Sequence, residues 1–266
     1  WYYYANAFTQ QEAEANLAAL QQRRLPFDVF QIDECWDQGF GEWYPNADWP
    51  DLAGLARRCR QAGCVPGIWT CGLLVEPRAR LGLHHPEWLL RRRGGGLVRF
   101  DMAGMANQVL DPTHPQVQRF LEETYRRLTE EYGFTYHKVD FTRAVVCDPE
   151  ASFHDPTANR AQAYRIGIEA IRRGIGPDAY LNICGGLYGP LVGLVDAQRT
   201  GSDVQSLWPA APPGQQDEGY GPFTIKQNAL RYWWNRLWDN DPDALMVRRR
   251  QHPYREQSLS LGLMSD

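Results

Sequence analysis

The segment TYHKVDFTRA, residues 135–144, is strand-like but carries three charged residues within six positions: Lys138, Asp140 and Arg143. On a β-strand, Lys138 and Asp140 are two positions apart, so their side chains point to the same face. One interpretation is a buried ion pair that stabilises the fold. The other is a nucleophile beside its charge partner.

Strand-like and helix-like segments alternate on both sides of this stretch. The strand-like segments are WYYYA (1–5), FDVFQID (27–33), VPGIWTCG (65–72), FTYHKVDF (134–141), AYLNIC (179–184), AQRTGSD (197–203) and DALMVR (243–248). Segments with helical spacing of apolar residues separate them at 9–25, 49–63, 111–133, 156–176, 189–196 and 223–238, with a hairpin expected in 75–110 and a last helix from Pro253. Repeated strand–helix units of this kind predict a parallel sheet covered by helices.

Seven strands in this order predict an α/β fold of the (β/α)8 TIM-barrel type. We expect its first strand to be clipped and its eighth to lie beyond Asp266, so that residues 1–266 are a single barrel domain excised from a longer chain. A doubly wound open sheet is the alternative, and the missing Gly-rich loop after the first strand disfavours it.

Composition limits the possible partners. Hydrophobic residues make up 43% and charged residues 23%, with a net charge of −4 and a pI near 5.9. This balance predicts neither a nucleic-acid nor an anionic-membrane partner. No apolar run reaches membrane-spanning length and no leader is visible, which favours the cytoplasm, although a chain that starts at Trp1 leaves the compartment open. An unclosed barrel exposes sheet edges, so homo-oligomers are a further expectation.

Active-site residues of a barrel collect where its strands end. Five predicted strands end in polar or small clusters: Asp33-Glu34-Cys35-Trp36, Trp69-Thr70-Cys71, Lys138-Val139-Asp140 with Arg143, Asn182-Ile183-Cys184-Gly185-Gly186, and Arg199-Thr200-Gly201-Ser202-Asp203. Two carboxylates from different strand ends, Asp140 and Asp203, suit acid–base or nucleophilic work on a glycosidic bond. A separation of about 5–5.5 Å would predict retention of configuration, and a wider gap inversion.

Other candidates have plainer explanations. A single Asp after a strand is commonly a cap or turn residue, and we assign that role to Asp111, Asp155, Asp217, Asp241 and Asp243. His84-His85 lacks a third ligand at plausible spacing, and the six cysteines form no C-x-x-C pair. We therefore expect free buried thiols and no metal or organic cofactor.

The segments FQIDECW, GIWT, YHKVDFTR, RTGSD and WDNDPDALMV, in this order, resemble the catalytic barrel of glycoside hydrolase clan D, whose families 27 and 36 include α-galactosidases (melibiases). The resemblance implies a retaining exo-α-glycosidase with Asp140 as nucleophile and Asp203 as acid/base. It implies sugar contacts from Asp33, Glu34, Trp36, Trp69, Lys138, Arg143, Cys184, Gly185 and Arg199. The expected partner is an oligosaccharide or glycoside.

Glu34 departs from the clan pattern, which has an aspartate there. One extra methylene moves the carboxylate by roughly a bond length and leaves the exact galacto-configured sugar open. Two alternatives share the barrel: a transglycosylase of the raffinose-family synthesis type, and a sugar-binding barrel without turnover.

Overall fold

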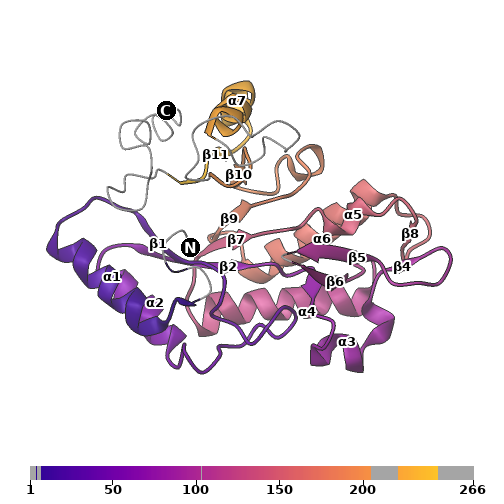
Figure 1. Cartoon of the computed structure of the whole chain (residues 1–266), viewed down its shortest axis with the longest axis horizontal. Coiled ribbons are helices and arrows are strands. Elements are labelled where there is room, and N and C mark those ends of the chain that lie inside the picture. The colour runs from indigo at the N-terminus through magenta and orange to yellow at the C-terminus, as the bar shows by residue number, and fades with distance from the viewer. Residues whose placement is uncertain (1–3, 5–6, 103, 205–220, 245–266) are drawn as a thin grey trace. The chain divides into compact units, whose positions relative to one another are not determined.

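The computed structural model describes residue 4 and residues 7–102, 104–204 and 221–244 (Figure 1). The chain divides into two compact units, Trp1–Leu194 and Val195–Asp266. The predicted first strand falls largely outside the described residues, as does the predicted helix from Pro253. Among the residues that are described, no helix is long and apolar enough to cross a membrane.

A parallel sheet forms the centre of the first unit. Its strands, in sheet order, are β1 (Val29–Ile32), β2 (Val65–Thr70), β7 (Tyr136–Val139) and β9 (Tyr180–Ile183). This spatial order is also the order along the chain, whereas a doubly wound sheet reverses direction at a switch point. The arrangement within this unit therefore agrees with the predicted barrel type and not with the alternative.

The register gives the sheet two different faces. Trp69, Lys138 and Asn182 lie opposite one another on β2, β7 and β9. The neighbouring row, Ile68, His137 and Leu181, is fully buried. Because successive side chains alternate between faces, one face carries the polar candidates and the other packs into the core.

Long helices flank the strands of this unit. They are α1 (Gln10–Gln22), α2 (Leu52–Gln61), α4 (Pro115–Arg126), which continues into the π-helical turn η3 (Arg127–Glu131), and α6 (Arg160–Ile175). Helices α1, α2 and α4 lie below the strands in Figure 1. Capping fixes where they begin: Thr9 with Glu12, and Asn159 with Gln162, form reciprocal capping boxes. The predicted helices at these places are confirmed.

The segment 75–110, predicted to hold a hairpin, contains more helices and strands than expected. Between β2 and α4 the chain forms β3 (Leu74–Val75), α3 (Arg80–His84), the 3₁₀ turn η2 (Pro86–Trp88), β4 (Arg91–Arg92), β5 (Arg99–Met102) and β6 (Met105–Val109). Strands β5 and β6 are the hairpin, and β3 joins them in a three-stranded antiparallel sheet. Short elements after β7 are α5 (Ala144–Cys147), β8 (Ala151–Ser152), which pairs with β4, and η4 (Gly189–Leu191).

In the second unit, β10 (Ala197–Arg199) pairs in parallel with β11 (Asp239–Asp241). Between them are α7 (Gly221–Arg231) and the 3₁₀ turn η5 (Tyr232–Arg236), which together match the single helix predicted over 223–238. The last predicted strand begins at residue 243, but the strand observed after α7 and η5 is Asp239–Asp241. Pro242 has no N–H to donate to a sheet, and Asp243 has a φ of +77°, so β11 ends there. Residues 245–248 lie outside the described residues.

Candidate active site

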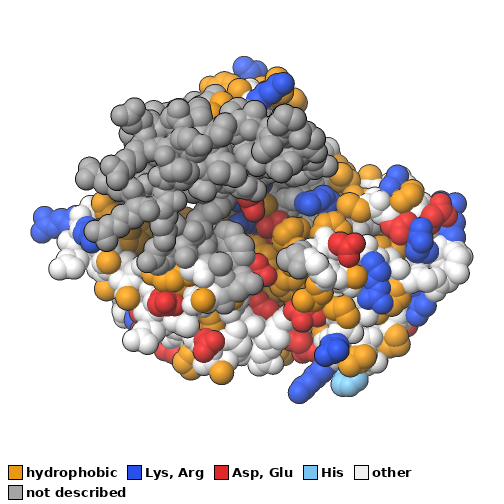
Figure 2. All heavy atoms as spheres, viewed as in Figure 1, with side chains coloured by type: hydrophobic (Ala, Val, Ile, Leu, Met, Phe, Trp, Pro, Cys, Tyr) orange, Lys and Arg blue, Asp and Glu red, His pale blue; other side chains and the backbone are white. Residues whose placement is uncertain are grey.

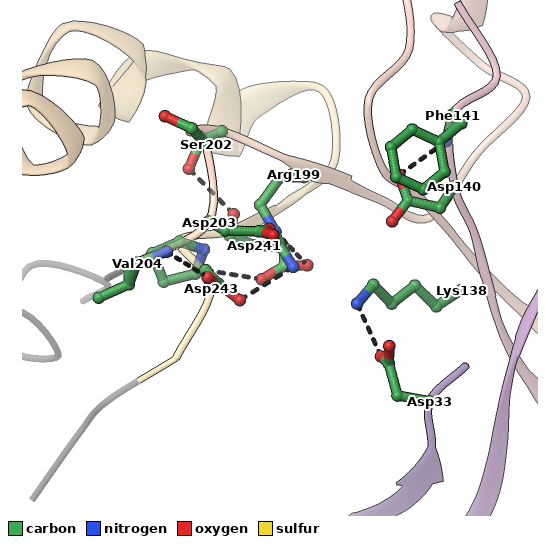
Figure 3. A network of polar contacts seen from close by, with 12 residues as sticks. Asp33, Lys138, Asp140, Phe141, Arg199, Ser202, Asp203, Val204, Asp241 and Asp243 are labelled. Carbon is green, nitrogen blue, oxygen red and sulfur yellow. Dashed lines mark hydrogen bonds and ion pairs between the residues drawn. The ribbon is translucent and has the colours of Figure 1, made fainter. Parts of the chain in front are cut away.

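The first unit holds an ion pair between two strand ends. Lys138 Nζ, from β7, lies 2.9 Å from Asp33 Oδ2, just after β1 (Figure 3). Gln31 Nε2 donates to the same oxygen at 2.9 Å. Both charged side chains are mostly buried, at 14% and 18% exposed. The sequence placed Lys138 beside Asp140, and the structure shows that its carboxylate partner in this pair is Asp33.

Asp140 is held by two donors from its own neighbourhood. The backbone N–H of Phe141 donates to Oδ1 at 2.7 Å, and the indole N–H of Trp69 donates to Oδ2 at 3.2 Å. The backbone N–H of Asp140 itself donates to the Thr70 carbonyl, which continues the β2–β7 ladder. The arrangement presents a fixed carboxylate at the end of β7.

The backbone around Asp140 is strained where these side chains meet. Phe141 has a φ of +51°, and Cys35, between Glu34 and Trp36, has a φ of +88°. Non-glycine residues seldom adopt this region, and such residues cluster at functional sites. Gly185 (φ +58°) allows a close approach, because a Cβ there would lie 3.2 Å from Asp140 Oδ1 and would overlap the Arg143 guanidinium.

Arg143 follows β7 and Cys184 follows β9, and the two residues make different contacts. Arg143 donates from its backbone and its guanidinium to the Gly185 carbonyl, and the guanidinium lies over the Phe100 ring. Cys184 is buried, and its backbone N–H donates to the Val139 carbonyl. None of the six cysteines, all within the described residues, forms a disulfide. The expectation of burial is wrong for Cys147, which is exposed, and Cys35 is half-buried.

The two candidate tryptophans differ in role. Trp36 is fully buried, tilts against Trp43 and donates its indole N–H to the Trp69 carbonyl at 2.8 Å. Its side chain has no exposed surface, and its indole N–H supports the backbone of Trp69. The contact with a sugar stays a prediction. Trp69 is also nearly buried, and its polar edge reaches Asp140. Trp36 is therefore linked to Asp140 through Trp69, first by the Trp69 backbone carbonyl and then by the Trp69 indole N–H.

Carboxylates are concentrated around Glu34. Burial is the largest cause that raises its pKa from 4.5 to about 7, and the negative charges of Asp33, Asp37, Asp140 and Glu76 add to it. Burial likewise raises the pKa of Asp37 from 3.8 to about 6, although Gly39 donates to its Oδ1 at 2.8 Å. Asp37 Oδ2 is buried without a hydrogen-bond partner. Sequence reasoning missed Asp37 and Glu76; three carboxylates in the five residues DECWD were the available signal.

In the second unit, Arg199 brings three carboxylates together. Its Nη1 lies 3.0 Å from Asp203, its Nε 3.2 Å from Asp241 and its Nη2 3.0 Å from Asp243 (Figure 3). The sequence predicted Arg199 and Asp203, but assigned Asp241 and Asp243 to turns. That assignment is incomplete, because both also pair with the guanidinium. Across the described residues, no group of three His, Cys, Asp or Glu side chains has an arrangement suited to a metal ion.

Parallel strands that follow each other in sheet order, with carboxylates at their ends, define a partial TIM-barrel-like fold of the α-galactosidase barrel type. A family model named Melibiase matches residues 3–176, and the chain belongs to the Melibiase family. This confirms the clan D resemblance.

Known relatives are similar in sequence and fold. The α-galactosidase TtGalA from Thermus thermophilus, solved with stachyose, is 27% identical with a TM-score of 0.87, over 98% of this chain and 56% of that one. The GH36 α-galactosidase AgaA from Geobacillus stearothermophilus matches the fold at a TM-score of 0.70 and 18% identity, over 100% of this chain and 36% of that one. A probable α-galactosidase G from Emericella nidulans is 32% identical over 49% of this chain and 18% of its own length. The chain thus spans about half or less of these relatives.

Proposed function

We propose that this chain carries the catalytic residues of a retaining α-galactosidase-like glycoside hydrolase. The observation that supports it most is the fixed Asp140 carboxylate, held by Trp69 and Phe141 at the end of β7 with the Lys138–Asp33 pair on the adjoining strand ends. Family membership and the relatives' names support the reaction class. Residues 1–266 are proposed to belong to one catalytic barrel domain.

The proposed reaction has two displacements at the anomeric carbon. In the first, a carboxylate oxygen of Asp140 bonds to that carbon while Asp203 gives a proton to the departing glycosidic oxygen. In the second, Asp203 takes a proton from water, and the water oxygen replaces Asp140. Two inversions give net retention, and the proton returns to Asp203.

The remaining candidates would hold the sugar. Asp33 and Lys138 supply a charged acceptor and a charged donor for its hydroxyls, Glu34 supplies a carboxyl group, and Trp69 supplies an indole beside the nucleophile. Arg143, Cys184 and Gly185 would border the sugar near Asp140, and Arg199 would do so beside Asp203. A galacto-configured α-glycoside is the proposed substrate. Glu34 would decide which of its hydroxyls is gripped.

Azide stereochemistry tests the two carboxylate roles separately. With an aryl α-galactoside, Asp140→Gly should lose at least about a thousandfold in kcat/KM, and added azide should yield the β-galactosyl azide. Asp203→Ala should instead yield the α-galactosyl azide, because azide then attacks the glycosyl-enzyme from the face that water uses. The exposed Asp178→Asn is the control and should match wild type.

Reversed azide products would exchange the two roles, and no azide product from either variant would overturn the double displacement. Adding sucrose as acceptor separates hydrolase from transglycosylase, because a transferase would give oligosaccharide in place of free galactose. Binding without turnover in the folded protein would leave the sugar-binding alternative.

A further inference from the structure

The Arg199 cluster distributes its three carboxylates unequally between core and solvent. The Arg199 side chain is 5% exposed, Asp241 22% and Asp243 9%, whereas Asp203 is 64% exposed. Two carboxylates therefore hold the guanidinium from the buried side, and the third extends outward from it. An arginine presents its donors in a rigid planar fork, so fixing two of its nitrogens also fixes the third.

Asp241 is itself anchored, both at its carboxylate and at its backbone. Asp241 Oδ1 accepts the backbone N–H of Asp243 at 2.9 Å, and Thr200 donates its backbone N–H to the Asp241 carbonyl at 2.8 Å. Burying an ion pair stabilises little unless further hydrogen bonds satisfy its oxygens. Here those bonds are present, so the arrangement around the guanidinium is rigid.

Asp243 also holds the backbone next to Asp203. Its Oδ2 accepts the N–H of Val204 at 2.7 Å, while its Oδ1 pairs with Arg199 (Figure 3). One carboxylate thus restrains Asp203 by two routes, through the guanidinium and through the following peptide. The φ of +77° at Asp243 is a strained conformation that this pair of contacts maintains.

We propose that Asp241 and Asp243 are positioning residues that orient the Asp203 carboxylate, through Arg199 and the Val204 peptide, for proton transfer to the leaving group. This inference rests on the acid/base role proposed for Asp203. One carboxylate is enough to neutralise the charge of the Arg199 guanidinium, so Asp241 and Asp243 are more than charge pairing requires. Their geometry points to orientation of the exposed member.

Asp→Asn variants isolate the charge contacts with little risk to folding. Arg199 keeps two carboxylate partners after either change, so no buried cation is left unpaired. Asparagine also tolerates positive φ, which preserves the turn at Asp243. Asp178→Asn makes the same chemical change at an exposed site and is the matched control.

The readout is the dependence of kcat/KM on the leaving group, compared between methyl α-galactoside and 2,4-dinitrophenyl α-galactoside. Departure of methanol needs the acid, whereas dinitrophenolate leaves without it. For Asp241→Asn and Asp243→Asn we expect a loss of about 10–100-fold on the methyl glycoside and less than about threefold on the dinitrophenyl glycoside. Asp243→Glu, which restores a displaced carboxylate, should recover part of the loss.

Asp203→Ala is measured in parallel so that the two proposals fail differently. It should show the same selective loss, larger, with azide accelerating turnover of the activated substrate. If it loses equally on both substrates and azide has no effect, the acid/base role of Asp203 is wrong. If Asp203→Ala behaves as expected but the Asn variants lose equally on both substrates, or not at all, the positioning role is overturned.

Discussion

The carboxyl of Glu34 should make the free energy of unfolding decrease as pH rises. Its carboxyl is half-buried, and burial with the charges of Asp33, Asp37, Asp140 and Glu76 raises its pKa from 4.5 to about 7. The folded protein therefore keeps a proton on Glu34 that the unfolded chain has lost between these two values. Because the folded state binds more protons there, raising pH through this window favours unfolding.

The size of the effect follows from the same two pKa values. The rise from 4.5 to about 7 corresponds to roughly 3 kcal/mol for a group shielded from solvent. Solvent screening at a half-buried carboxyl reduces this to about 1–2 kcal/mol. Asp37 titrates in an overlapping window with the same sign, so total stability changes more than Glu34 alone explains. The Lys138–Asp33 pair offsets part of the negative charge.

Replacing Glu34 with Gln removes this one titration and keeps the shape of the side chain. We expect Glu34→Gln to gain about 1–2 kcal/mol over wild type as pH rises from 4.5 to 7, measured by urea unfolding with tryptophan fluorescence. Glu123→Gln, at an exposed position, is the control and should run parallel to wild type. If the Glu34→Gln curve is parallel as well, the carboxylate cluster does not hold a proton on Glu34.

Two further predictions concern the core. Burial lowers the pKa of His137 from 6.5 to about 4, so the free energy of unfolding should fall by up to about 3 kcal/mol as pH drops through this range. In urea unfolding, His137→Gln should lose this pH dependence. A pH dependence equal to that of wild type would contradict the prediction. A Cβ at Gly174 would lie 2.6 Å from the Glu122 carbonyl oxygen, where α6 crosses α4. Gly174→Ala should lower the free energy of unfolding by at least about 2 kcal/mol. The control is Gly189→Ala, where a Cβ would enter open space, and it should change this free energy by less than about 1 kcal/mol. Equal midpoints of the two variants in thermal unfolding would refute the clash.

The parallel sheet was predictable because each strand has a local signature. Residues 27–33 and 65–72 are apolar-rich runs that end next to polar residues, and a helix capped by Asp51 follows the first of them. The strand at 243–248 was misplaced because the apolar letters of ALMV outweigh the acidic segment before them. In the structure, pairing with β10 makes Asp239–Asp241 the strand despite its charge. That tertiary pairing has no local signal in the sequence.

The sequence indicates which side chains stand at the strand ends, but not which partners they contact. Spacing places Lys138 and Asp140 on one face, yet the ion pair of Lys138 crosses to β1 and reaches Asp33. Likewise, Trp36 belongs to a motif at the end of a strand, but its indole turns into the core beneath Trp69. Sequence distance along one strand cannot show which neighbouring strand supplies a partner.

The assignment of Asp241 and Asp243 to turns shows why single-residue interpretations of acidic side chains are incomplete. A carboxylate has two oxygens, and each can serve a different group. Asp241 uses Oδ1 to accept the N–H of Asp243 in the turn, and Oδ2 to pair with Arg199. Asp140 divides its oxygens in the same way, between the Phe141 N–H and the Trp69 indole. A turn role and a role in the site are therefore compatible, and the turn contact fixes the direction of the second oxygen.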